Sequence, residues 1–355
     1  MMDEAMNSMA YKKMRGVCAT LLLAAVACLM SGCHDNDYVR DFTPRTNFNA
    51  LWEIIDTKYC YLNEKNVDWN GVREVYQPKV DSVKTVYELF DVLAQMLDTL
   101  QDGHVNLYAP FDVSRCSGWY DEYPENFSST ILYSPNYLGS DYRISAGMEY
   151  GLIANGKVGY IRYASFSNPF SAYGMKYIDA MFERCKGIII DVRNNGGGSL
   201  EYSAQLAASF FKERTVTGYI RHKTGPGHDE FSAPEPLYTD PKNAPIDWSS
   251  RHIVVLCNRR SYSATNDFVN RVKMAKNVVV MGGVTGGGGG MPLSSELPCG
   301  WMIRFSAVPM YDAEMNTTEF GVMPDVEVTM DSASMSEGRD AIIDAAVQYL
   351  NKFLR

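Results

Sequence analysis

Near its centre the chain reads Gly187-Ile-Ile-Ile-Asp-Val-Arg-Asn-Asn-Gly-Gly-Gly198. The first half is an apolar run, which is typical of a strand buried on both faces of a sheet. Three glycines then let the backbone approach a ligand and turn N–H groups toward it. No Gly-Lys-Ser/Thr sequence follows, which excludes a Walker phosphate loop. The stretch therefore predicts a buried strand that ends in a generic loop or in a ligand-binding turn.

Strand and helix patterns alternate on both sides of this stretch. We expect strands over residues 158–163, 252–257 and 277–281, and helices over residues 201–211, 264–276 and 341–350. This alternation predicts an α/β fold in which helices flank a parallel or mixed sheet. Residues 302–329 are expected to form a β-hairpin.

A small helical module is expected before the α/β core. Asp68 is a candidate N-cap, while Thr85 and Glu88 form a capping-box sequence ahead of an apolar helical stripe. That helix should end near Gly103, a residue that reverses the chain easily. The predicted organisation is a linker over residues 34–47, a helical module over 48–103 and an α/β core over 104–355.

A serine-containing turn opens one of the predicted helices. Ser261-Tyr-Ser-Ala264 lies between the apolar run 252–257 and the helix expected from residue 264. The N-terminus of a helix offers free N–H groups and positive potential, which suit a developing oxyanion. Serine is also a common helix cap, and the local sequence alone favours that role for Ser261 or Ser263.

One of the five histidines lies at the predicted boundary between module and core. Asp102-Gly-His104 forms a tight turn there, whereas the other histidines lie in the tail, in a polar loop or at a strand start. Histidine has an ordinary pKa that suits proton transfer near neutral pH. Considered alone, His104 is more typical of a loop residue than of a catalytic base.

Six short motifs occur in one order along the chain. They are Leu100-Gln-Asp-Gly-His-Val105, Gly159-Tyr-Ile-Arg-Tyr163, Asp191-Val-Arg-Asn-Asn-Gly-Gly-Gly198, Ser261-Tyr-Ser-Ala264, Gly282-Gly-Val-Thr-Gly286 and Gly321-Val-Met-Pro-Asp325. Together they resemble the C-terminal processing and tricorn-type serine peptidases over nearly the whole chain from Leu51 onward. The resemblance implies a crotonase/ClpP-like α/β core, with a mixed sheet flanked by helices, and peptide-bond hydrolysis by an activated serine.

The resemblance also implies roles for single residues. Ser263 would be the nucleophile, and the backbone N–H of Ala264 would bind the oxyanion. Gly197 would supply the second N–H, with Gly198 as its nearest rival. The processing branch has a lysine base at the position that Gly288 occupies here, so a serine–lysine pair cannot be assumed.

The tricorn branch instead takes a histidine base from the turn that contains His104. A carboxylate near the Gly321–Asp325 motif supports that branch's site, and Glu319 is the best candidate here. Asp102 could orient the histidine instead, or simply close the turn. Asn266 also departs from the family, which often has glutamate there. The chain between His104 and residue 158 is too short for the PDZ domain of processing peptidases.

These assignments predict a serine-type peptidase that forms an acyl-enzyme on peptides or unfolded proteins. Because the lysine is missing, a catalytically inactive peptide-binding surface lipoprotein on the same fold is the alternative. No cofactor is implied, and the absence of a Cys-x-x-Cys sequence gives no support to a structural metal site. The net charge of −9 gives no support to nucleic-acid binding.

The N-terminus has the pattern of an export signal. Basic residues precede an apolar stretch from Val17 to Met30, which is too short to span a bilayer comfortably. Met30-Ser-Gly-Cys33 resembles a bacterial lipobox, which implies a lipoprotein signal peptide over residues 1–33 and lipidation of Cys33. We expect an envelope lipoprotein in the outer membrane of a Gram-negative-type bacterium, bound to the membrane only through its lipid. Surface exposure is left open.

Overall fold

The computed structural model describes residues 40–185 and 187–353. The predicted signal peptide, Cys33 and most of the predicted linker lie outside the described residues. From Phe42 onward the chain folds as one unit. Helix α2 begins at Pro44, within the range expected to be linker, because Pro44 is well suited to the first position of a helix.

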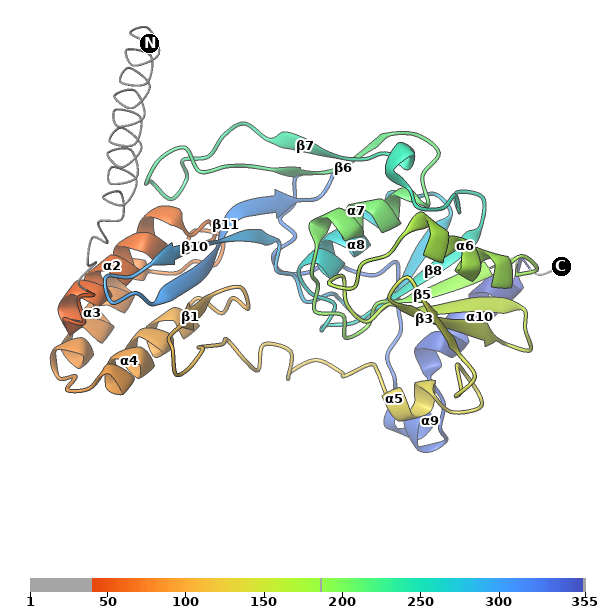
Figure 1. The fold of residues 1–355 in the computed structure, drawn as a ribbon, viewed down its shortest axis with the longest axis horizontal. Coiled ribbons are helices and arrows are strands. Elements are labelled where there is room, and N and C mark those ends of the chain that lie inside the picture. The colour runs from red at the N-terminus through yellow and green to blue at the C-terminus, as the bar shows by residue number, and fades with distance from the viewer. Residues whose placement is uncertain (1–39, 186, 354–355) are drawn as a thin grey trace, which may run out of the picture. The chain divides into compact units, whose positions relative to one another are not determined.

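A seven-stranded mixed sheet forms the α/β part of the fold (Figure 1). Its order is β12-β9-β8-β5-β4-β3-β2, in which β4, β5, β8, β9 and β12 are parallel and β3 and β2 are antiparallel. The strands are β2 (Arg143–Ser145), β3 (Met148–Ile153), β4 (Val158–Arg162), β5 (Gly187–Asp191), β8 (His252–Cys257), β9 (Val278–Gly282) and β12 (Val326–Glu327). The predicted buried strands are confirmed, and every residue of β4 and β5 is buried.

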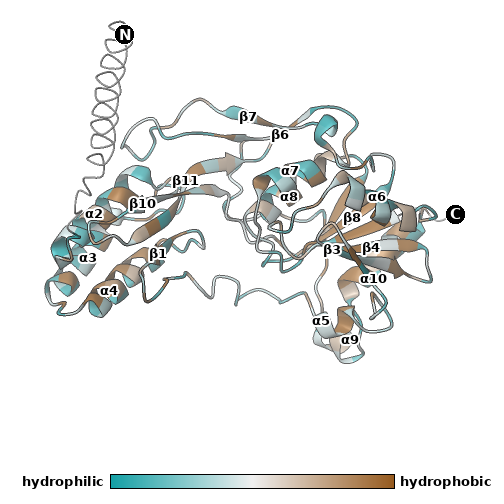
Figure 2. Cartoon of the chain, in the orientation of Figure 1, coloured by the Kyte–Doolittle hydropathy of each residue, from teal (hydrophilic) through white to brown (hydrophobic). Residues whose placement is uncertain are grey.

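Helices cover both faces of this sheet because alternate strand residues point to opposite sides. Ile188 and Ile190 of β5 pack with α6 (Ala172–Met181), α7 (Leu200–Ala208) and α8 (Ala264–Val272). Ile189 packs with α5 (Ser129–Leu132) and α10 (Ala341–Asn351). The helix α9 (Ser332–Ser336) precedes α10. The apolar strand β8 is largely brown in Figure 2.

A second, antiparallel sheet has the order β1-β11-β6-β7, with β10 also paired to β11. Its strands are β1 (Asn106–Tyr108), β6 (Thr215–Ile220), β7 (Glu235–Thr239), β10 (Gly290–Glu296) and β11 (Met302–Tyr311), and the short helix η1 (Pro241–Asn243) follows β7. The hairpin predicted over residues 302–329 is wrong. The glycine run ends as a strand rather than as a loop, so β11 pairs with the preceding β10. The short strand β12 pairs with β9 in the mixed sheet and not with β11.

Three helices precede β1, as the sequence predicts. They are α2 (Pro44–Lys58), α3 (Trp69–Asp81) and α4 (Val86–Asp98). Asp68 caps α3, and the predicted capping box of Thr85 and Glu88 is present on α4. Leu93 and Leu97 share one hydrophobic core with Ile303 of β11, so the helices and the antiparallel sheet stabilise each other.

Candidate active site

Ser263 occupies a sharp turn between β8 and α8. Its backbone has φ 59° and ψ −120°, an unusual conformation for a residue other than glycine. Its side chain makes no capping hydrogen bond to α8. Ser261, the other candidate cap, donates its hydroxyl to the Val192 carbonyl instead. The turn therefore exposes the Ser263 hydroxyl at a helix N-terminus without using it to cap the helix.

The structure brings His104 and Ser263 together although 159 positions separate them. The distance from His104 Nε2 to Ser263 Oγ is 2.9 Å, within hydrogen-bond reach. The Asp102 carboxylate holds the turn because it accepts the backbone N–H of His104 at 2.8 Å. The Tyr262 ring lies against the imidazole, with 4.9 Å between ring centroids. This geometry is the one that a serine nucleophile and its base require.

The environment keeps the His104 ring neutral near pH 7. Burial, opposed by the Asp102 carboxylate and the Gly290 backbone and assisted by the Arg304 charge, lowers the pKa of His104 to about 4. A neutral imidazole can accept the serine proton through Nε2. The other ring nitrogen, Nδ1, is buried and makes no hydrogen bond to a side chain in the described residues, while the backbone of Gly290 lies near enough to raise the pKa of the ring.

Neither candidate for the third catalytic member binds that nitrogen. Asp102 accepts the Tyr59 hydroxyl at 2.9 Å and the Ser306 hydroxyl at 2.8 Å, in addition to the backbone of His104. Glu319, the other candidate, is held by Lys65 and accepts the Gly289 N–H at 2.9 Å. Both carboxylates are buried near the base, but neither orients its ring by a hydrogen bond.

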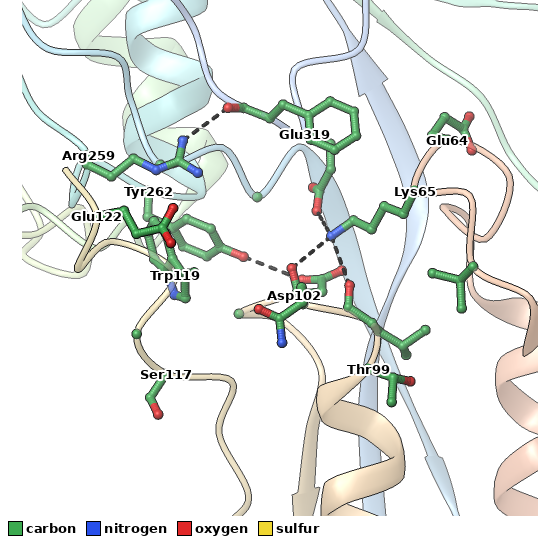
Figure 3. A pocket seen from close by; sticks show the side chains of 18 of the residues that line it. Glu64, Lys65, Thr99, Asp102, Ser117, Trp119, Glu122, Arg259, Tyr262 and Glu319 are labelled. Atoms are coloured by element: carbon green, nitrogen blue, oxygen red, sulfur yellow. Dashed lines mark hydrogen bonds and ion pairs between the residues drawn. The ribbon is translucent and has the colours of Figure 1, made fainter. Parts of the chain in front are cut away.

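Lys65 is a charged residue at this site that the sequence did not reveal. Its Nζ lies 2.7 Å from a Glu319 carboxylate oxygen and donates to the Gln101 carbonyl at 3.1 Å (Figure 3). Burial and the nearby Asp102 raise the pKa of Glu319 to about 8, while Lys65 opposes this shift. Lys65 follows α2 in a segment without a motif, so no local signal marks it. Its ammonium links the His104 turn to the segment around Glu319.

The free backbone N–H groups favour one glycine over the other as an oxyanion donor. Ala264 is the first residue of α8, where the N–H has no partner within the helix. The Gly197 N–H already donates to the Asn195 side chain at 2.9 Å. The Gly198 N–H makes no hydrogen bond in the described structure, and Gly198 lines the same pocket as Ser263. The geometry thus favours Gly198, the rival in the sequence analysis, over Gly197.

Asparagine side chains fasten the glycine turn to the serine turn. The Asn194 N–H donates to the Asn258 side chain at 2.9 Å, and the Tyr262 N–H donates to the Asn195 carbonyl at 3.0 Å. A Cβ at Gly197 would lie 2.8 Å from the Cβ of Ser263, so only glycine permits this approach. The two motifs therefore form one rigid unit.

The missing lysine at position 288 has a steric explanation. Gly288 has φ +72°, and a Cβ there would overlap the Tyr262 ring. A side chain at this position would push Tyr262 away from His104. Asn266, the other departure from the family, is buried and bridges the Thr318 carbonyl and the Thr285 hydroxyl. Both departures are accommodated by local packing.

Two pockets adjoin His104 and Ser263. A cavity of about 230 Å³ is lined by His104, Ser263, Gly198 and Arg304, among others. A larger one of about 760 Å³ is lined by Lys65, Asp102, Trp119, Tyr262 and Glu319, and both share Gly288 (Figure 3). The larger volume lies in the usual range of ligand-binding pockets.

Other kinds of site find no support in the part of the chain that the structure describes. It contains no group of histidine, cysteine and acidic residues that could hold a metal ion. Its five cysteines are free, and all of them except Cys116 are buried. None of its helices has the length and apolarity needed to cross a membrane.

Comparisons with known proteins agree with this geometry. The model of peptidase family S41 matches residues 157–328, and the model of the tricorn protease C1 domain matches residues 43–98. A search of curated proteins finds no match.

Solved structures show the same fold. A candidate peptidase from Parabacteroides merdae is 47% identical, with a TM-score of 0.82, and the match covers 87% of this chain and 97% of that one. The photosystem II D1 C-terminal processing protease is 16% identical, with a TM-score of 0.52 and coverage of 81% and 94%. The tricorn protease is 17% identical, with a TM-score of 0.54 and coverage of 88% and 37%. The chain belongs to peptidase family S41.

Proposed function

We propose that this member of the family is an active serine peptidase with Ser263 as nucleophile and His104 as base. The observation that carries the proposal is the 2.9 Å contact between His104 Nε2 and Ser263 Oγ. The His104 ring is unprotonated at neutral pH, so Nε2 is free to accept the serine proton, but its lowered pKa of about 4 makes it a weaker base than an exposed histidine.

The reaction would proceed through an acyl-enzyme. His104 Nε2 takes the hydroxyl proton as Ser263 Oγ bonds to the substrate carbonyl carbon. The N–H groups of Ala264 and Gly198 stabilise the resulting oxyanion. His104 then donates its proton to the leaving amine as the C–N bond breaks. Water, deprotonated by His104, attacks the ester, and the serine recovers its proton.

The lack of a carboxylate partner for Nδ1 affects this mechanism. When Nε2 accepts a proton, Nδ1–H carries part of the positive charge without a carboxylate to stabilise it. Burial makes that charge costly. We therefore expect a slower enzyme than one with a complete triad. An experiment must then distinguish a slow peptidase from the inactive peptide-binding alternative.

Labelling with a fluorophosphonate probe tests the proposal, because the probe reacts with activated serines whatever the substrate. The wild-type protein should be labelled at Ser263, and Ser263→Ala should not be labelled. His104→Gln should reduce the labelling rate by several orders of magnitude, about 10⁴-fold. Ser250→Ala is the control, because Ser250 is exposed and lines neither of the two pockets. An unlabelled wild-type protein that binds peptides would establish the inactive alternative.

We also propose export and lipid anchoring. The apolar stretch from Val17 to Met30 and the sequence Met30-Ser-Gly-Cys33 support this. The mature chain would begin at a diacylated Cys33 in the outer membrane. Cys33→Ser should abolish labelling with a palmitate analogue and move the protein from the membrane to the soluble fraction. Retention of lipid in that variant would contradict the proposal.

A further inference from the structure

Arg304 is an arginine in the catalytic pocket without a partner. It lines the 230 Å³ cavity together with Ser263 and His104. Within residues 40–185 and 187–353, its guanidinium makes no hydrogen bond and no ion pair. It is only partly buried, so its charge stays accessible from the cavity.

The strand register directs Arg304 toward the base. In β11, Ile303 and Phe305 pack into the core shared with the helices, and alternate residues point the other way. Ser306 lies on the same side as Arg304 and donates to Asp102, which holds the turn of His104. Arg304 pairs in register with Asn106, two residues after His104.

No carboxylate in the cavity neutralises this arginine. Asp267 is the one acidic residue among the lining residues that the structure describes. Its carboxylate is already bound by the Arg271 side chain at 2.8 Å and by the Ser203 hydroxyl. Asp102 and Glu319 are occupied by the contacts described above. The cavity therefore carries an uncompensated positive charge beside the nucleophile.

The fold pairs two of its buried arginines with carboxylates. Arg193 contacts Asp191 at 2.7 Å and Asp340 at 2.9 Å, and Arg271 contacts Asp267. An arginine left unpaired in a cleft retains its donors for an incoming acceptor. Guanidinium matches carboxylate geometry through two parallel hydrogen bonds.

We infer that Arg304 binds a carboxylate of the peptide substrate and so determines specificity, an inference that rests on the proposed peptidase function. The carboxylate could be the C-terminal carboxylate of the peptide or the side chain of an aspartate or glutamate. The first source would make the protein a peptidase that acts near C-termini. The second would make it selective for acidic residues at internal positions.

Bound carboxylate would also strengthen the base. The Arg304 charge lowers the pKa of His104, so an anion paired with Arg304 would raise that pKa again. Substrates with the recognised carboxylate would then react through a more basic His104. Binding and proton transfer are thereby coupled.

The experiment compares matched peptides in two independent assays. One peptide of a pair has a C-terminal acid and the other an amide, and a second pair contains internal aspartate or asparagine. Their kcat/KM values are measured with wild type, Arg304→Met, Arg304→Lys and Arg304→Glu at pH 8. Their affinities are measured by fluorescence anisotropy in Ser263→Ala proteins with and without Arg304→Met. Arg115→Met is the control, because Arg115 is exposed and does not line this cavity.

Wild type should prefer the carboxylate member of one pair by about 30-fold, a typical effect of a charged hydrogen bond in a cleft. Arg304→Met and Arg304→Glu should abolish this preference, Arg304→Lys should retain part of it, and Arg115→Met should retain all of it. The pair that responds identifies the source of the carboxylate. An equal preference in wild type and Arg304→Met would overturn the inference.

The binding assay and probe labelling separate this inference from the proposed function. A protein without labelling or cleavage that still shows an Arg304-dependent preference in binding would refute the peptidase proposal and retain the carboxylate site. Normal labelling without that preference would support the peptidase proposal and refute the carboxylate site.

Discussion

The depressed pKa of His104 predicts activity at unusually low pH. Its environment lowers the pKa to about 4, whereas an exposed histidine titrates near 6.5. At pH 5.5 about 97% of His104 would then be neutral, against roughly 9% for an ordinary histidine. Since only the neutral ring can accept the proton of Ser263, the rate at pH 5.5 should remain close to its value at pH 7.

The same shift affects stability in the opposite sense. Because the unfolded chain binds the proton more readily, stability falls as the pH decreases from 6.5 toward 4. The loss from this group amounts to roughly 1 kcal/mol at pH 5.5 and roughly 3 kcal/mol at pH 4. His104→Gln should lack this contribution, so the difference between the two pH profiles of unfolding free energy isolates it.

The assay is the second-order rate of fluorophosphonate labelling between pH 4.5 and 8, with circular dichroism at each pH to confirm that the protein is folded. The expected profile is flat above pH 5.5 and declines only near pH 4 to 5. A midpoint near 6.5 in a fully folded protein would refute the reasoning, because it would mean that His104 is solvated during the reaction.

Three further changes test other parts of the site. Gly288→Ala should displace the Tyr262 ring and reduce the rate of fluorophosphonate labelling at least tenfold, with an unchanged circular dichroism spectrum. An unaffected labelling rate would mean that the Tyr262 ring does not position His104. Arg193→Met should lower the free energy of unfolding by about 3–5 kcal/mol, since it leaves buried carboxylates unpaired. Urea denaturation measures the loss, and a loss below about 1 kcal/mol would contradict the prediction. Glu319 has a raised pKa of about 8, so it contributes stability below pH 4.5 that is lost as the pH rises through 8. Glu319→Gln should flatten this decline when Tm is measured against pH. Identical profiles of Tm against pH for wild type and Glu319→Gln would exclude the carboxyl group as the source of the decline.

Local patterns in the sequence predict most of the elements. The capping box at Thr85 and the apolar run after Gly187 each specify one element without help from distant residues. The pairing of β11 with β10 was missed, because the glycine run from Gly286 to Gly290 carries no strand signal. Its backbone becomes a strand only when β11 lies beside it.

In the candidate site, too, some residues could be predicted from the sequence and some contacts could not. The order of the motifs placed Ser263 and His104 in one site, and the structure brings them into contact. The contacts of Glu319 could not be predicted, because its partner Lys65 lies 254 positions away in a segment without a pattern. The choice between Gly197 and Gly198 depends on which N–H the Asn195 side chain occupies, a fact of geometry that spacing does not encode.

The contact between nucleophile and base depends on two hydrophobic cores. Ala264, next to the nucleophile, packs into the core over the mixed sheet, while Val105, next to the base, packs into the core of the helices and the antiparallel sheet. The Gly286–Gly290 segment connects them, since its Gly287 carbonyl accepts the Ser263 N–H and β10 begins at Gly290. A displacement of about 1 Å between catalytic groups can cost about 10²-fold in rate. The N-terminal helices therefore do more than extend the fold, because without their core the base would have no fixed position relative to the serine.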